Sequence, residues 1–141
     1  MSEVVMLRRK QMPEALRPAW THFVMQAERV EAARQALLGC LPVGRVDPAP
    51  VPVGLDLVRD ELKAIGQELD VWRVTEIEQA WQRCRTAIEE SLGAVEEARR
   101  VAEISGELEE LLEAVGDVTE PLDAWADAER SWLVLRTRRS S

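Results

Sequence analysis

This chain of 141 residues contains no tyrosine, one phenylalanine and one histidine. β-Strands are enriched in aromatic and β-branched residues that alternate with polar ones, and the Val, Ile and Thr residues here do not alternate in that way. Alanine, leucine, glutamate and arginine dominate instead, and these residues favour helices. The sequence therefore predicts a single all-α domain over residues 1–141.

Cysteine is also scarce. Cys40 and Cys84 are too few and too far apart for a disulfide framework or a clustered zinc site, so we expect two reduced thiols in the core. The histidine, His22, lacks the glutamate three residues earlier that is typical of metal sites in helical bundles. No glycine-rich phosphate loop and no catalytic motif occurs. We therefore expect no enzymatic activity, no cofactor and no metal.

Long apolar runs are missing as well. No run approaches the roughly 18 residues that a membrane-spanning helix needs. At the amino terminus, Arg8, Arg9 and Lys10 follow a short apolar run, which is the reverse of a secretory signal. We therefore expect a cytoplasmic protein that makes no membrane contact.

Proline divides the first part of the chain. Residues 1–12 are interpreted as a basic N-terminal tail, and residues 18–38 follow the spacing of a bundle helix, with Pro18 in its first turn and Gly39 after its end. Residues 41–54 contain four prolines, which predict an extended connector. At about 3.1 Å per residue this connector could span roughly 40 Å, so the helices on either side of it could run parallel.

A long helical region is predicted over residues 55–115. Its apolar pattern slips by one residue near 71–75, where Thr75 and Glu78 have the spacing of a helix-capping pair. The slip indicates either a short break or one long helix with a stutter, and a second drift of the pattern follows Gly93.

The last helix is predicted over residues 119–137. Gly116 is expected to end the preceding helix, and Thr119 is expected to cap the last one. A connection this short would let the last helix fold back antiparallel, with Trp125 and Trp132 on its buried face.

These segments together predict an elongated bundle of about four helices with one long central helix and coiled-coil-like packing. A helix over residues 75–115 would be about 60 Å long, roughly twice the first or the last. This mismatch allows three arrangements: an elongated bundle, a kink near Gly93, or a second chain that covers the exposed apolar stripe, as in a homodimer.

Negative charge is concentrated between Glu103 and Glu129, where ten carboxylates occur without a lysine or arginine. Five of them lie opposite the apolar stripe of the helical wheel and are candidate partner-binding residues: Glu103, Glu107, Glu109, Glu110 and Glu113. The stripe itself consists of Val101, Ile104, Leu108, Leu111 and Val115. Carboxylates four positions apart repel each other by a few tenths of a kcal/mol. This face is therefore interpreted either as simply solvated or as a surface for a basic partner, which could be another protein or the arginine-rich ends of this chain.

Tryptophan is frequent, with five residues on or beside the apolar stripes. This placement predicts core packing. Indole rings are also enriched at the centres of protein interfaces. If one stripe binds a partner, Trp72 and Trp81 are the candidate docking residues because they flank the slip in the apolar pattern.

The charge distribution bears on function. Residues 54–129 carry seven basic and twenty-one acidic groups, whereas the basic clusters at the two ends of the chain are short. We therefore do not expect direct nucleic-acid binding. The leading hypothesis is a non-catalytic helical protein–protein interaction module, either an adaptor or a subunit of a larger assembly. The alternative is an acidic inhibitor or regulator that mimics nucleic acid and occupies a basic groove of a nucleic-acid-binding protein.

Overall fold

The structure is a computed structural model that describes residues 12–41, 51–105 and 107–139. These residues form α-helices and short 3-10 turns and no strand, so the all-α prediction is confirmed. The α-helices are α2 (Arg17–Leu38), α3 (Val51–Gln67), α4 (Glu78–Ile104), α5 (Leu108–Thr119) and α6 (Ala124–Arg139). The 3-10 turns are η1 (Glu14–Leu16), η2 (Leu69–Trp72), η3 (Thr75–Ile77) and η4 (Glu120–Asp123).

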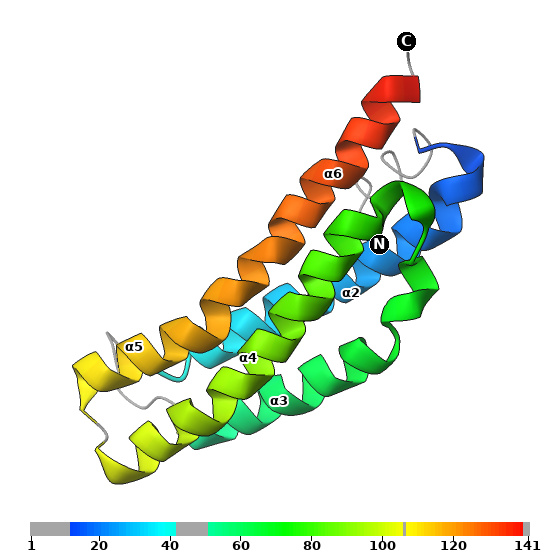
Figure 1. Cartoon of the computed structure of the whole chain (residues 1–141). Helices are drawn as coiled ribbons and strands as arrows, with labels where there is room; N and C mark the ends of the chain where they lie inside the picture. Colours follow the sequence, from blue (N-terminus) through cyan, green and yellow to red (C-terminus); the bar gives the residue numbers. More distant parts are fainter. Residues whose placement is uncertain (1–11, 42–50, 106, 140–141) are drawn as a thin grey trace.

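The helices form a bundle of four rods, because α5, η4 and α6 follow one another without a gap (Figure 1). This last rod runs antiparallel to α4. The Ser91 hydroxyl donates a 2.7 Å hydrogen bond to the carbonyl of Val118, and further along Cys84 Sγ lies 3.9 Å from the carbonyl of Ala124. The bundle prediction is therefore confirmed.

Helices α2 and α3 also run antiparallel, which rules out the parallel arrangement that the long connector allowed. The side-chain amide of Gln26, in the first half of α2, donates a 2.9 Å hydrogen bond to the carbonyl of Glu68, just after α3. At the other end, Gly54 in the first turn of α3 lies against Leu37 and Cys40 at the end of α2.

The first predicted helix is confirmed, since α2 ends at Leu38 as expected. The connector is shorter than predicted, because α3 already begins at Val51 with Pro52 in its first turn. Proline is tolerated there because the first N–H groups of a helix have no intrahelical partner. Residues 42–50 of the connector, and residues 1–11 of the predicted tail, lie outside the described residues. Met12, the last residue of that tail, is buried.

Of the two alternatives for residues 71–75, a short break or a stutter in one long helix, the structure shows the break. Helix α3 ends at Gln67, η2 and η3 follow, and α4 begins at Glu78. The predicted capping pair was wrong, because no side chain caps η3 or α4. Helix α4 continues through Gly93 without interruption, so no break occurs there.

A second break, which the sequence did not predict, separates α4 from α5 after Ile104. The predicted long central helix is therefore wrong: residues 55–115 are divided among three helices. The predicted end at Gly116 is also wrong, since α5 runs through it to Thr119. Thr119 caps no helix; its hydroxyl donates to the carbonyl of Gly116 at 3.4 Å.

The last helix therefore does not fold back on residues 108–115. Instead, α6 extends the rod of α5 and packs its tryptophans against α2. Trp132 lies 5.7 Å from Trp20 between ring centroids, and Trp125 stacks on Phe23 at 5.8 Å. Together with Trp72 these rings form the aromatic core of the bundle.

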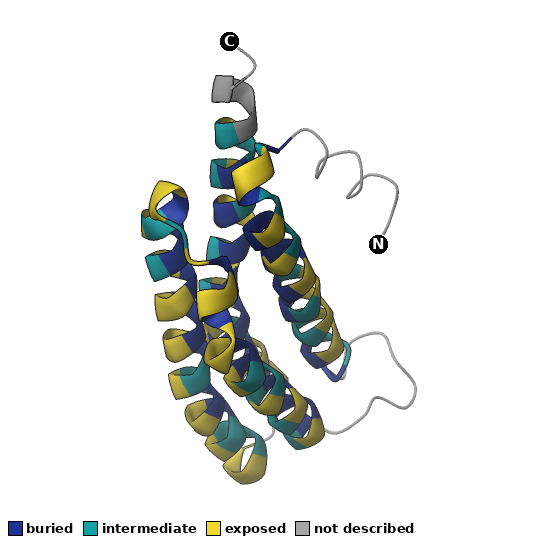
Figure 2. Ribbon diagram, turned by 90° about the vertical axis from the view of Figure 1, so that its right-hand side faces the viewer, coloured by how far each residue is buried: buried dark blue, intermediate teal, exposed yellow. Residues whose placement is uncertain are grey.

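Figure 2 shows buried residues on the inner faces of the rods and exposed residues outside, which is the pattern that amphipathic helices produce. Cys40 and Cys84 are buried free thiols, as predicted. In the described part of the chain, none of the helices combines the length and the apolar character that a bilayer crossing requires.

Candidate binding surface

Trp72 and Trp81, the candidate docking residues, belong to the core. They are 0% and 2% exposed. The indole N–H of Trp81 donates a 2.9 Å hydrogen bond to the carbonyl of Leu69, and that of Trp72 donates to Gln26 at 2.7 Å. Arg73 also covers the Trp81 ring, with its guanidinium carbon 3.9 Å from the ring centroid. Their assignment to a docking surface is corrected, because neither indole can reach a partner without opening the bundle.

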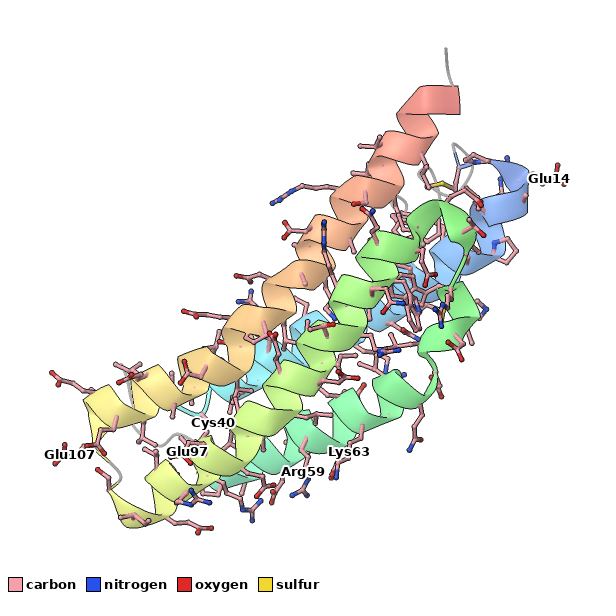
Figure 3. All side chains as sticks on the ribbon, in the orientation of Figure 1. Glu14, Cys40, Arg59, Lys63, Glu97 and Glu107 are labelled. Atoms are coloured by element: carbon pink, nitrogen blue, oxygen red, sulfur yellow. The ribbon has the colours of Figure 1, made fainter. Side chains whose placement is uncertain are left out.

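The candidate carboxylates lie at the turn between α4 and α5, at one end of the bundle. Glu103, Glu107, Glu109, Glu110 and Glu113 are all exposed. Figure 3 shows Glu107 at this end and Glu14 at the opposite end. The outward orientation that the helical wheel predicted for these five residues is therefore confirmed.

These carboxylates have little compensating positive charge. Glu103 lies 3.7 Å from Arg99, whose guanidinium also donates a hydrogen bond to Asp56 of α3. None of the other four carboxylates forms an ion pair with a residue that the structure describes. Because the side chains are exposed, water solvates them, and their mutual repulsion costs little in the isolated protein.

Apolar side chains are exposed at the same turn. Ile104 is 79% exposed, and Leu108 and Leu112 are each 43% exposed. The sequence predicted Ile104 and Leu108 on the buried stripe, and this part of the prediction was wrong because the chain reverses between them. Leu111 and Val115 are buried, as predicted.

Helix α3 adds two more exposed apolar side chains at this end. Val53 and Leu57 lie one helical turn apart and are exposed. The hydrogen bond between Arg99 and Asp56 places this part of α3 beside the last turns of α4. We use the name α4–α5 surface for the five carboxylates together with Ile104, Leu108 and Leu112.

Exposed apolar groups ringed by charge of one sign are typical of surfaces that bind other proteins. The apolar side chains gain free energy when they leave water, at about 25 cal/mol per Å² of buried apolar area. The carboxylates raise the rate of encounter with positively charged partners and disfavour negatively charged ones. The α4–α5 surface is therefore suited to a basic, amphipathic protein surface.

The chemistry of a catalytic or metal site is not evident in the described residues. They contain no group of three or more His, Cys, Asp or Glu side chains placed to hold a metal ion. Burial raises the pKa of the Cys84 thiol to about 12, so this group is not a nucleophile at neutral pH. His22 is exposed on α2.

Comparison with known proteins gives no family for this chain. No protein-family model, no curated protein and no solved structure matches it.

Proposed function

We propose that this protein is a non-catalytic, cytoplasmic interaction module, either an adaptor or a subunit of a larger assembly. Its α4–α5 surface binds a protein partner with a basic, amphipathic surface. One observation carries the proposal: Ile104, Leu108 and Leu112 are exposed within a group of carboxylates of which only Glu103 forms an ion pair with a described residue.

The two components of this surface have different roles in binding. Burial of the leucines at an interface lowers the free energy of the complex. It also slows dissociation, because the two proteins can separate only if this apolar surface is exposed to water again. The carboxylates mainly accelerate association, and salt weakens this effect because it screens exposed charges. A real interface should therefore respond both to removal of the leucines and to reversal of the charges.

Affinity purification of tagged variants, with quantitative mass spectrometry, tests the proposal. Glu107→Lys, Glu110→Lys and Glu113→Lys are introduced together, and Leu108→Gln with Leu112→Gln is made separately. The matched control reverses three exposed carboxylates at or near the opposite end: Glu14, Asp70 and Glu76. We expect the same partner to be lost from both α4–α5 variants and retained by the control. Retention by both α4–α5 variants would refute the proposal.

Nucleic-acid mimicry remains the second candidate, and it is favoured because Glu107, Glu109, Glu110 and Glu113 form no ion pair within the described part of the chain. A mimic depends on charge, so its binding should fall steeply with salt and vanish in the lysine variant. The binding of a mimic to its partner should survive the change of Leu108 and Leu112 to glutamine. Survival of binding to a nucleic-acid-binding protein in that variant would replace the first proposal by the second.

A second copy of the chain is a third occupant that the same variants distinguish. Light scattering coupled to size exclusion measures whether the wild type is a monomer at micromolar concentration. A dimer that dissociates when Leu108 and Leu112 are changed to glutamine would identify the α4–α5 surface as a homodimer interface. A monomeric wild type agrees with a partner of different sequence.

A further inference from the structure

The end of α6 is basic. Between Arg130 and Arg139 the sequence has four arginines and no aspartate or glutamate. Arg130 forms an ion pair with Asp127 at 2.7 Å. The other three arginines, Arg136, Arg138 and Arg139, occupy the last turn of the helix. This turn therefore concentrates positive charge in a chain whose net charge is −8.

Apolar side chains precede these arginines. Val134 is 49% exposed, and Leu133 and Leu135 are half-buried. Positions 134 and 138 are one helical turn apart, so an exposed valine and an arginine belong to the same face of the helix. We use the name α6 tip for residues 133–139. The α6 tip is both basic and apolar, which is the chemistry that suits the α4–α5 surface.

The α6 tip cannot reach the α4–α5 surface of its own molecule. Val134 and Thr75 line one cleft, so the tip lies beside the start of α4, whereas the α4–α5 surface lies at the end of that helix. Helix α4 has 27 residues, which gives a length of about 40 Å at 1.5 Å per residue. Figure 1 shows α5 and the far end of α6 at opposite ends of the bundle. A contact between the two surfaces must therefore join two molecules.

We propose that the α4–α5 surface binds the α6 tip of a second copy of this chain. This inference rests on the proposed function of the α4–α5 surface and names its partner. In the complex, the arginines of one molecule oppose the carboxylates of the other, which favours this orientation over its alternatives. Burial of Val134 against Leu108 and Leu112 removes apolar area from water and stabilises the contact.

The contact is head-to-tail, because each molecule contributes a different surface. An oligomer of this kind keeps one α4–α5 surface and one α6 tip open at its ends, so the contact repeats unless it closes a ring. Glu14 and Glu76 lie near the tip but belong to η1 and η3. The charge match is therefore between the α4–α5 surface and α6 itself, rather than the whole end of the bundle.

Sedimentation velocity of the purified full chain, over a series of concentrations and at low and high salt, tests the inference. We expect the average mass to rise with concentration at low salt and to return to that of the monomer at high salt, because salt screens exposed charges. A wild type that stays monomeric up to millimolar concentration at low salt would overturn the inference. That result leaves the proposed function intact, because affinity purification measures binding of a partner with a different sequence.

Charge reversal identifies the two surfaces. The lysine variant of the α4–α5 surface is compared with a tip variant that carries Arg136→Glu, Arg138→Glu and Arg139→Glu. Each variant alone should remain monomeric, since like charges then oppose each other. An equimolar mixture of the two should associate again, because the lysines of one variant meet the glutamates of the other. A mixture of folded variants that stays monomeric would exclude direct pairing of the two surfaces.

A neutral variant guards against loss of the helix end, since glutamates are unfavourable at a helix C-terminus. Arg136→Gln, Arg138→Gln and Arg139→Gln together should raise the dissociation constant about tenfold, the size expected for three exposed ion pairs. Far-ultraviolet circular dichroism should stay unchanged. The matched control of the proposed function, which reverses carboxylates outside α6, should self-associate like the wild type. Unchanged self-association of a folded glutamine variant would show that the α6 tip is not the occupant.

Discussion

The indole N–H of Trp72 donates a 2.7 Å hydrogen bond to the side-chain oxygen of Gln26, although the two residues lie 46 positions apart. Gln26 is a buried polar residue, and its amide nitrogen also donates to the carbonyl of Glu68 at 2.9 Å. One amide group therefore connects α2 to two residues of the break between α3 and α4, Glu68 and Trp72. Buried polar groups that are satisfied in this way favour one arrangement of the helices over others.

Replacement of Gln26 by leucine should lower the free energy of unfolding by about 1–3 kcal/mol, because the buried Trp72 N–H loses its acceptor. Chemical denaturation followed by circular dichroism measures the change. Gln35→Leu is the matched control, since Gln35 lies on the same helix but is exposed. Equal stability of the two variants would show that the Trp72 hydrogen bond does not stabilise the bundle.

The aromatic core between α2 and α6 gives a second prediction. Trp125 is buried against Phe23, so Trp125→Ala should cost about 3–5 kcal/mol and lower the melting temperature steeply. Asp123→Ala and Asp127→Ala should change stability by less than about 0.5 kcal/mol, because both residues are exposed. Differential scanning calorimetry measures all three. A Trp125→Ala protein that melts like the wild type would contradict the packing of α6 on α2.

The sequence located an irregularity after α3 without deciding between a break and a stutter, whereas the break after α4 could not be seen in the apolar pattern. At the first break, the slip in the apolar pattern between Trp72 and Ile77 shows that one straight helix cannot bury both residues on the same side. At the second, the steps from Ile104 to Leu108 and Leu111 keep helical spacing across the turn. The pair Ser105–Gly106, a common turn sequence, was the remaining signal.

The same turn limited the prediction of the candidate surface. The outward orientation of the carboxylates followed from the helical wheel most clearly for Glu109 and Glu113, which lie on the opposite side of α5 from Leu111. The exposure of Ile104 and Leu108 did not follow from the wheel, since it depends on where the chain reverses. The burial of Trp72 likewise depends on a tertiary partner, Gln26, that no local pattern indicates.

Glycine positions give a third prediction. A Cβ atom at Gly93, in the middle of α4, would meet nothing within 4 Å, so Gly93→Ala should stabilise the protein by about 0.5–1 kcal/mol. A Cβ atom at Gly54 would lie 2.7 Å from Cys40 Sγ and 3.2 Å from Leu37, so Gly54→Ala should destabilise it. Urea denaturation measures both changes.

A double variant tests the cause of the loss at Gly54. Cys40→Ala removes the sulfur atom that a new Cβ would meet, so the double variant should be more stable than the sum of the two single effects predicts. If the stability change of the double variant equals the sum of the two single changes, the Cys40 sulfur is not the source of the clash.

Alkaline pH should destabilise the protein through Cys84. Burial, followed by the nearby charge of Asp127, raises the pKa of this thiol from an ordinary value of 9.0 to about 12. Between these two values the unfolded chain has lost the proton and the folded chain keeps it. The unfolded state then binds fewer protons than the folded state. The contribution of the thiol to stability is therefore fully present below the pKa of the unfolded chain, and it is lost as the pH rises toward the pKa of the folded chain.

Cys84→Ala isolates this effect. The alanine variant is less stable than the wild type at neutral pH because it leaves a cavity, and it lacks the thiol ionisation. By about pH 10.5 the wild type should have lost about 2 kcal/mol through the thiol, so the stability gap between the two proteins should narrow by that amount. The chain has no tyrosine, and Cys40 is present in both proteins, so other groups that titrate in this range cancel in the comparison. Unfolding in guanidinium chloride at both pH values measures the gap. A gap that stays constant would mean that the Cys84 thiol ionises as readily in the folded chain as in the unfolded one, which its burial between α4 and α6 argues against.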